Sequence, residues 1–280
     1  MQKLIYKKNF LKMKSQNTKH NLLEINLFSH LHDGNRVLFC KTDFLSSIFS
    51  YISNLTNDVI LITGNSDYEI NDNIINQAPK NIKYWFAQNA NSNNIFGIPM
   101  GLENSLACKI SGHGYVWPHA SPKHSLIHSA KDKLPSKNVY GNFSISTNPS
   151  IRQKVFNICQ YNEHITSDIC FNHQEINKKS YSNYTNNILD HKMVVCPEGN
   201  GIDCHRVWET LLLGRVPIVK KTKVMNHFSD LPILYLDDWD ELENLNSLNQ
   251  SYESVKNNSV EKLNFKYWKN FILSLKDEIL

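Results

Sequence analysis

The chain has 280 residues and a formal net charge of +4 at pH 7, with 41% hydrophobic and 20% charged residues. This composition is that of an ordinary folded protein, long enough for one large domain or two smaller ones. The charge is too small to indicate nucleic-acid binding, and no apolar run approaches the roughly 18 residues of a membrane-spanning helix.

The first twenty residues contain six lysines and no acidic residue. No continuous apolar run of about 7–15 residues follows, so this basic lead predicts no secretory signal. It is typical of a solvated segment, and the alternative is a weak electrostatic contact with an anionic membrane surface. Six cysteines without a CxxC pair predict reduced thiols in a cytoplasmic protein, with peripheral membrane association as the alternative.

Short β-rich runs alternate with polar or helical stretches, a pattern that predicts an α/β fold with parallel sheets and crossover helices. The predicted strands of the first half are 37–40, 59–63, 82–86 and 95–98. A stretch rich in Ser, His, Pro and Lys follows over 112–137 and predicts a long loop or linker. We therefore divide the chain into two lobes, residues 1–136 and 137–280.

The second half repeats the alternation. Its predicted strands are 139–145, 165–171, 193–196, 216–219 and 233–236. Thr147 to Arg152 predicts a helix start, because a Thr or Asn cap precedes a proline in the first turn. Residues 265–280 carry apolar and aromatic side chains at helical spacing and predict a C-terminal helix that packs on one or both lobes.

Residues 196–221, CPEGNGIDCHRVWETLLLGRVPIVKK, predict a bend and a helix between two strands. Asp203 is the expected N-cap of a helix over 204–213, and Gly214 is its expected C-terminal stop. The glycines of the bend let the backbone approach a ligand, and the helix start offers free N–H groups with about half a positive charge. We expect an anion here, most naturally a diphosphate.

Arg206 and Glu209 lie one turn apart on this helix. Arg206 can add a planar, permanently charged fork to the anion. Glu209 lies along the same side and would be repelled by phosphate, so we expect it to accept hydrogen bonds from ribose hydroxyls. The alternative is a surface ion pair on an ordinary helix, since the loop matches neither GxGxxG nor GxxxxGK[ST].

Residues 194–241, VVCPEGNGIDCHRVWETLLLGRVPIVKKTKVMNHFSDLPILYLDDWDE, resemble the donor-binding half of exostosin-type glycosyltransferases. The shared pieces are a Pro-x-Gly-x-Gly loop, an Arg-x-Trp-Glu helix, a Gly-x-x-Pro-Ile/Val turn and a later Leu-Pro…Asp-Trp. The segments NFSISTNPSIR (142–152) and WFAQNANSNNIFGIPMGLEN (85–104) resemble small glycosyltransferases of this type more loosely. The first lobe departs from the exostosin pattern.

The resemblance implies a GT-B architecture of two Rossmann-like lobes and an inverting transfer from a nucleoside diphosphate sugar, usually without an essential metal. It makes Arg206 and Glu209 donor contacts. The donor-binding candidates are Glu198, Gly199, Asn200, Gly201, Asp203, His205, Arg206, Glu209 and Arg152. No cofactor is expected besides the nucleotide-sugar donor substrate.

Acceptor and base are expected beyond the carboxyl ends of the first-lobe strands, where ligands bind in open α/β sheets. An inverting transfer needs a base within about 3 Å of the acceptor hydroxyl. Glu103 and Asp67 are the leading carboxylates for this role, and His113 is a third candidate. The acceptor-side candidates are Gln88, Asn89 and His113, and Asp43 also follows a predicted strand.

Two patterns raise the question of a metal. Asp238-Trp239-Asp240 is a DxD sequence, the metal–diphosphate motif of the other glycosyltransferase fold. It opens a predicted helix, where aspartates serve as caps and dipole partners. His113, His119, His124 and His128 have irregular spacing, interrupting prolines and no accompanying Cys pair, which argues against zinc. We expect no metal site.

The sequence thus predicts a glycosyltransferase that moves a sugar from a nucleoside diphosphate donor to a carbohydrate acceptor and that binds no nucleic acid. One alternative is a retaining nucleotide-sugar transferase. The other, from a different class, is a non-catalytic module that binds nucleotide or sugar.

Overall fold

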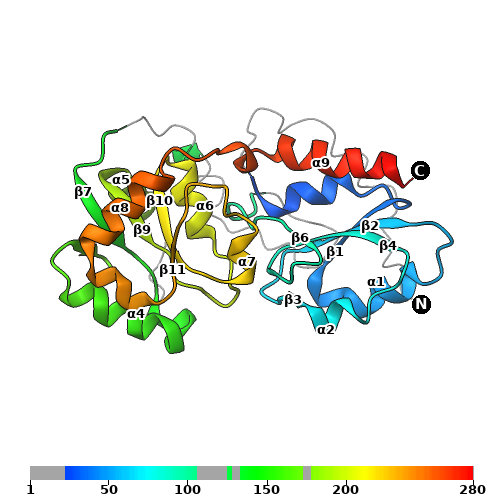
Figure 1. Cartoon of the computed structure of the whole chain (residues 1–280), viewed down its shortest axis with the longest axis horizontal. Helices are drawn as coiled ribbons and strands as arrows, with labels where there is room; N and C mark the ends of the chain where they lie inside the picture. Colours follow the sequence, from blue (N-terminus) through cyan, green and yellow to red (C-terminus); the bar gives the residue numbers. More distant parts are fainter. Residues whose placement is uncertain (1–22, 106–124, 128–132, 173–177, 280) are drawn as a thin grey trace. The chain divides into compact units, whose positions relative to one another are not determined.

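The computed structural model describes residues 23–105, 125–127, 133–172 and 178–279. The chain forms two compact units (Figure 1). It passes from unit 1 to unit 2 between Trp117 and Pro118, and returns to unit 1 between Leu263 and Asn264. Each unit is built on its own parallel sheet.

Unit 1 contains a four-stranded sheet in the order β1-β2-β4-β6, and every pairing in it is parallel. Its strands are β1 (Val37–Lys41), β2 (Val59–Gly64), β4 (Ile82–Ala87) and β6 (Phe96–Gly97). A separate parallel pair is formed by β3 (Ile70–Asn71) and β5 (Ala90–Asn91). β1 and β2 are buried along their whole length, as expected for strands covered on both faces.

Helices cover the unit 1 sheet. They are η2 (Ile25–Leu31), η3 (Thr42–Phe44), α1 (Leu45–Ile52), α2 (Asp72–Ile75) and α9 (Phe265–Glu278). One core packs Ile48 and Ile52 of α1 with Leu38, Leu61 and Trp85 of the sheet. A second set of aromatic contacts joins Phe28 of η2 to Phe265 and Trp268 of α9, and Phe86 of β4 to Phe271. The C-terminal helix is therefore part of unit 1.

Unit 2 contains a five-stranded sheet in the order β11-β10-β9-β7-β8, again entirely parallel. Its strands are β7 (Lys137–Gly141), β8 (Ile165–Ser167), β9 (His191–Val195), β10 (Val216–Lys220) and β11 (Leu234–Leu236). Numbered within the unit this is the doubly wound order 2-1-3-4-5. The chain moves outward in one direction from β7 to β8 and in the other from β9 onward, so the topological switch point lies between β7 and β9.

The helical elements of unit 2 surround this sheet. They are η4 (Ile145–Thr147), α4 (Pro149–Tyr161), α5 (Lys178–Asp190), α6 (His205–Leu212), α7 (Lys223–Asn226), η5 (Trp239–Glu243), α8 (Leu245–Val255) and η6 (Glu261–Leu263). One apolar core joins the sheet to α4, η5 and α8 through residues such as Val155, Val195, Trp239 and Leu248. This packing fixes the loops that follow β7 and β9.

The predicted α/β class, the parallel sheets and the terminal helix are confirmed. Two predicted strands are too long: 139–145 ends as β7 at Gly141, and 165–171 ends as β8 at Ser167. The predicted boundary after residue 136 also differs from the observed division, because the chain leaves unit 1 earlier and α9 returns to it. The apolar face of α9, with Trp268, Ile272 and Leu275 buried, belongs to the unit 1 core.

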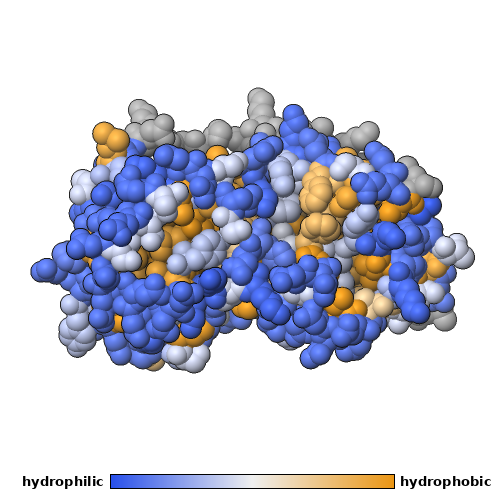
Figure 2. Space-filling model, viewed as in Figure 1, coloured by the Kyte–Doolittle hydropathy of each residue, from blue (hydrophilic) through white to orange (hydrophobic). Residues whose placement is uncertain are grey.

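Hydrophilic residues cover most of the face seen in Figure 2, and apolar surface is visible between them. Every helix in the described ranges is too short or too polar to cross a membrane. The basic lead, predicted to be a solvated segment with a weak membrane contact as the alternative, lies outside the described residues. The cysteines within the described ranges, Cys40, Cys159, Cys170, Cys196 and Cys204, are free thiols as predicted.

Candidate functional site

The loops after β7 and β9 meet at the switch point of the unit 2 sheet. β7 and β9 are paired neighbours, with Gly141 opposite Val195. The chain after β7 leads through η4 into α4, and the chain after β9 leads through residues 196–204 into α6. In open α/β sheets the crevice beyond such a pair of strand ends is where ligands bind.

Side chains of the first loop hold the second loop in place. Asn148, which precedes α4, donates from Nδ2 to the Gly199 carbonyl over 2.9 Å. Within the loop, the Gly199 N–H donates to the Gly201 carbonyl over 3.0 Å. A Cβ on Gly199 would lie 3.3 Å from Nη2 of Arg152, so the backbone passes close to that guanidinium. Asn200 is exposed at the tip of the loop.

Arg152 of α4 is the main support of this loop. Its Nε donates to the Glu198 carbonyl over 2.8 Å, Nη1 donates to the Ser144 carbonyl over 2.8 Å, and Nη2 donates to the Pro197 carbonyl over 3.3 Å. The side chain is buried, 4% exposed. Burial and the neighbouring charge of Arg206 lower the pKa of Arg152 to about 10. Burial also raises the pKa of the Glu198 carboxyl.

Arg206 lies in the first turn of α6, as predicted. Its Nε is buried and has no hydrogen-bond partner among the described residues. Burial by itself lowers the pKa of Arg206. The nearby acidic groups outweigh this effect and raise the pKa overall. These groups include Tyr184, Cys196 and Glu209. Burial raises the pKa values of Tyr184 and Cys196 well above their ordinary values.

The arrangement suits an anion. The guanidiniums of Arg152, which is buried, and of Arg206, which is half-buried, lie close enough for the charge of Arg206 to lower the pKa of Arg152. A buried unpaired donor and two like charges are both unfavourable in a folded protein. A bound anion relieves both costs, because it accepts the open hydrogen bond and compensates the excess positive charge.

Glu209 is held by two tyrosines of α5. The Tyr184 hydroxyl donates to Oε2 over 2.7 Å, and the Tyr181 hydroxyl donates to Oε1 over 3.3 Å. Glu209 is only 5% exposed. The alternative of a solvent-exposed Arg206–Glu209 surface ion pair is therefore wrong, because the carboxylate is buried and bonded to another helix.

The start of α6 differs by one residue from the prediction. The helix begins at His205, and its N-cap is Cys204, which gives no side-chain cap hydrogen bond. Asp203 is 2% exposed, and its Oδ1 accepts a 2.8 Å hydrogen bond from the Trp208 indole N–H. Asp203 thus fastens the loop to the helix instead of capping it. The predicted C-terminal stop is confirmed, since Gly214 has a φ of +69°.

In unit 1, three of the predicted residues meet at the end of β2. The Gln88 side chain accepts from the Asn65 N–H over 2.7 Å and donates to the Ser66 carbonyl over 3.0 Å. Asn89 donates from Nδ2 to the Ser66 and Asp67 carbonyls over 3.3 and 3.4 Å. Both amides are 1% exposed, whereas Asp67 is exposed. Their predicted contacts with an acceptor stay predictions.

Glu103 is half-buried in the segment after β6, and His113 lies outside the described residues. Near Glu103 the structure contains a buried carboxylate that the sequence did not single out. Glu24 is 2% exposed, and its Oε2 accepts from both the N–H and the hydroxyl of Ser105 over 2.9 Å. It lies in a stretch with no strand or helix signal of its own, so only the fold reveals it.

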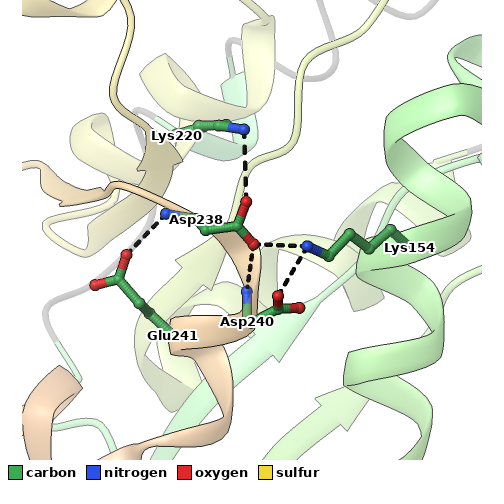
Figure 3. A network of polar contacts seen from close by, with 5 residues as sticks. All are labelled: Lys154, Lys220, Asp238, Asp240 and Glu241. Carbon is green, nitrogen blue, oxygen red and sulfur yellow. Dashed lines mark hydrogen bonds and ion pairs between the residues drawn. The ribbon is translucent and has the colours of Figure 1, made fainter.

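The DxD sequence forms a capped helix start (Figure 3). Asp238 accepts from the Asp240 N–H over 3.1 Å, and Glu241 accepts from the Asp238 N–H over 2.8 Å, which together form a capping box. Lys154 of α4 lies 2.6 Å from Asp238 and 3.0 Å from Asp240. The predicted capping role is confirmed. Among the described residues no cluster of His, Cys, Asp or Glu is arranged to hold a metal ion.

In unit 2, sequence reasoning missed three residues that contact the site: Tyr181, Tyr184 and Asn148. The two tyrosines stand three residues apart on α5, a spacing that places them on one helix face. That spacing signals a shared contact surface, but it does not identify Glu209 as the partner.

Among curated proteins, none matches this chain. One similar solved structure is that of an alpha1,3-fucosyltransferase, with 11% sequence identity and a TM-score of 0.43 over 86% of this chain and 78% of that chain. This likeness is too weak to support an assignment.

The family model of the RXYLT1 C-terminal domain matches residues 123–280. The matched region includes α4 with Arg152, the loop after β9, and α6 with Arg206. The match supports the predicted glycosyltransferase activity, whereas membership of the exostosin family is a finer assignment that stays a prediction. Because the match covers more than half of the chain, the chain belongs to the RXYLT1 C-terminal domain family, a family of glycosyltransferases.

Proposed function

We propose that the chain transfers a sugar from a nucleoside diphosphate sugar to a carbohydrate acceptor, with inversion at the anomeric carbon. The observation that carries this proposal is the pair of neighbouring arginines at the switch point of the unit 2 sheet, Arg152 buried and Arg206 half-buried. Arg152 supports the loop after β9, and Arg206 has a buried Nε with no partner among the described residues.

The donor diphosphate, in this proposal, binds at the N-terminal end of α6. The first N–H groups of the helix lack a side-chain cap, and a helix start attracts negative charge. Arg206 donates to the phosphate oxygens, while Arg152 adds positive charge and keeps the loop in shape. His205 and the loop from Glu198 to Gly201 line the same end of the helix.

The ribose of the donor is assigned to Glu209. Each carboxylate oxygen can accept two hydrogen bonds, and Tyr181 and Tyr184 supply one to each oxygen. Two neighbouring hydroxyls are donors of the kind that a carboxylate accepts. The tyrosines then fix the carboxylate in one orientation before the donor arrives, which lowers the entropic cost of binding.

The proposed reaction is a single displacement. The acceptor oxygen forms a bond to the anomeric carbon as the bond from that carbon to the diphosphate oxygen breaks. The proton of the acceptor hydroxyl passes to a base, for which Glu103 and Asp67 are the candidates within the described residues. Negative charge develops on the departing diphosphate, and the fixed guanidiniums stabilise it in place of water.

In this proposal no cofactor takes part, and the arginines perform the charge neutralisation that a divalent ion performs at a DxD motif. Asp238 forms a capping box with Glu241, and the carboxylates of Asp238 and Asp240 both bind Lys154. We therefore expect transfer to persist in EDTA. Activity that is lost in chelator and restored by Mn²⁺ points instead to a metal-dependent transferase.

The experiment that tests the function is a donor screen on the whole chain. UDP- and GDP-linked pentoses and hexoses are incubated with a panel of simple glycosides, and products are detected by mass spectrometry. The proposal expects a glycoside enlarged by one sugar residue and release of the matching nucleoside diphosphate. NMR of the product shows whether the anomeric configuration is inverted, and retention identifies the retaining alternative.

Nucleotide binding without turnover for any donor and acceptor supports the alternative of a non-catalytic binding module. Absence of nucleotide binding in the same preparation contradicts the proposal, because the proposed donor is a nucleotide sugar. Cytoplasmic location, contact with an anionic membrane surface and the lack of a nucleic-acid partner stay predictions.

A further inference from the structure

The loop that follows β2 in unit 1 is held by side chains on both sides. Gln88 bonds to the Asn65 N–H and to the Ser66 carbonyl, and Asn89 bonds to the Ser66 and Asp67 carbonyls. From another direction, Asn104 donates to the Asn65 side chain over 2.9 Å. These side-chain bonds restrict the conformation of the loop.

The backbone around this loop is unusual as well. Among the described residues, the non-glycine residues with positive φ are Asn65 at +57° and Asn89 at +54°. They lie at the ends of the neighbouring strands β2 and β4, and their side chains both take part in the loop network. Asparagine tolerates this conformation best of the ordinary residues, and such residues gather at functional sites.

The fixed loop presents Tyr68 and Asp67 to solvent. Tyr68 is 65% exposed, the highest value among the large hydrophobic side chains of the described part of unit 1. Its N–H donates to the Ser66 hydroxyl over 3.3 Å, so its backbone is part of the fixed loop. The position is the carboxyl edge of a parallel sheet, where open α/β folds bind ligands.

An exposed aromatic ring and an exposed carboxylate on consecutive residues are groups that suit a pyranose sugar. The sugar has an apolar face of C–H groups, which packs on an aromatic ring, and a rim of hydroxyls, which donate to a carboxylate. Tyrosine combines an apolar ring with a polar tip and has few rotatable bonds, so it orders at low entropic cost. The loop backbone that carries this ring is held before binding, which lowers the entropic cost of ordering the loop.

We propose that Tyr68 is a stacking platform for a pyranose ring of the acceptor, with Asp67 accepting hydrogen bonds from its hydroxyls. The proposal rests on the proposed glycosyltransferase function, because it assigns the carbohydrate acceptor to this loop. It concerns residues of unit 1 alone, whereas the nucleotide site is assigned to residues of unit 2.

The test is saturation-transfer NMR on the full chain with methyl pyranosides of glucose, galactose, mannose and xylose as probes. Sorbitol is the negative probe, since it has hydroxyls but no ring face. The proposal predicts transfer to the ring C–H protons of at least one pyranoside. Tyr68→Ala should weaken the binding of that pyranoside about tenfold or more, a change of about 1.4 kcal/mol. Tyr68→Phe keeps the aromatic ring and should keep most of the binding.

Tyr161→Ala is the matched control. Tyr161 is 85% exposed at the end of α4 in unit 2, so its removal deletes an exposed tyrosine far along the chain from the loop. The control should bind the pyranoside as the parent protein does. Equal binding by Tyr68→Ala and the parent, or no pyranoside signal from the parent, overturns the proposal.

A parallel titration with UDP and GDP separates the two claims. Tyr68→Ala should bind the nucleotide with unchanged affinity, because the unit 2 loop is untouched. If nucleotides bind and pyranosides do not, the proposed role of Tyr68 is contradicted and the proposed function stands. If pyranosides bind through Tyr68 and no nucleotide binds, the transferase proposal fails and a sugar-binding site remains.

Discussion

The Tyr184 hydroxyl lies 2.7 Å from Oε2 of Glu209 and donates a hydrogen bond to it. These residues come from different helices, and the bond joins α5 to the helix that carries Arg206. Glu209 is almost completely buried. A buried carboxylate needs such partners, because an unpaired charge in a protein interior costs several kcal/mol.

Removal of this hydroxyl should therefore affect stability and donor binding together. Tyr184→Phe should lower the free energy of unfolding by about 1.5–3 kcal/mol, the range for hydrogen bonds to charged groups. Tyr181→Phe is the matched control, since its 3.3 Å bond to the same carboxylate is longer and should contribute less. Urea denaturation of both variants measures the two losses of stability. Equal losses for Tyr184→Phe and Tyr181→Phe contradict the assignment of the stronger hydrogen bond to Tyr184.

The strands and the loop–helix unit were predictable because local signals specify them. The apolar run Val59–Thr63 predicts a buried strand, and the structure has β2 there. The helix of the switch-point loop was predicted to within one residue at each end, because Gly214 and the bend mark its limits. Such signals lie within a few residues of the feature that they predict.

The partners of the site residues were not predictable in this way. Tyr184 and Glu209 are 25 residues apart in sequence, and nothing local shows that their helices meet. The sequence placed Gln88 and Asn89 correctly after a strand, but it could not show that their amides face the neighbouring loop. The terminal helix was predicted by its spacing, yet its assignment to unit 1 depends on aromatic contacts with Phe28 and Phe86.

Two glycines offer a matched test of the backbone. Gly101 and Gly214 have nearly the same conformation, with φ of +71° and +69°. A Cβ on Gly214 meets nothing within 4 Å, whereas a Cβ on Gly101 would lie 2.2 Å from the Leu23 carbonyl oxygen. Gly214→Ala should cost about 1–2 kcal/mol of stability for the left-handed backbone alone.

Gly101→Ala adds a clash with the backbone to that cost. Its loss of stability should exceed that of Gly214→Ala by at least about 1–3 kcal/mol. Thermal and urea unfolding of the two variants measure the difference. Similar stabilities for the two variants contradict the close approach of Leu23 to Gly101.

The Lys154–Asp238 contact makes a prediction about pH. The hydrogen bond from Lys154 lowers the pKa of Asp238 from its ordinary 3.8 to about 2. A lowered carboxyl pKa stabilises the folded protein above pH 3.8, and this contribution is lost as the pH falls towards about 2. Lys154→Met should return the pKa of Asp238 towards 3.8. The stability of this variant should then decrease less between pH 3.8 and about 2 than that of the parent protein.

NMR titration of the Asp238 carboxyl measures the change directly. Lys220→Met is the control, because Lys220 lies 3.8 Å from Asp238 and should have the smaller effect. An Asp238 pKa that is unchanged in Lys154→Met contradicts the assignment of the shift to Lys154.

The base is tested by conservative substitutions in unit 1. Glu103→Gln and Asp67→Asn preserve shape and remove the charge. The true base should lose about 10²-fold or more in kcat while donor affinity stays nearly constant. If neither variant behaves this way, both carboxylates are excluded as the base and His113→Gln is the next variant to measure.

The central claim is that Arg206 binds the diphosphate of a nucleotide donor. Titration calorimetry with UDP and GDP on the parent protein, Arg206→Lys and Arg206→Ala tests it most directly. Loss of a charge-assisted hydrogen bond costs about 1.5–3 kcal/mol, or about tenfold to a hundredfold in Kd. The account predicts that loss for Arg206→Ala and an intermediate affinity for Arg206→Lys, which keeps the charge without the planar fork. Equal affinities in all three proteins, each shown to be folded, contradict it.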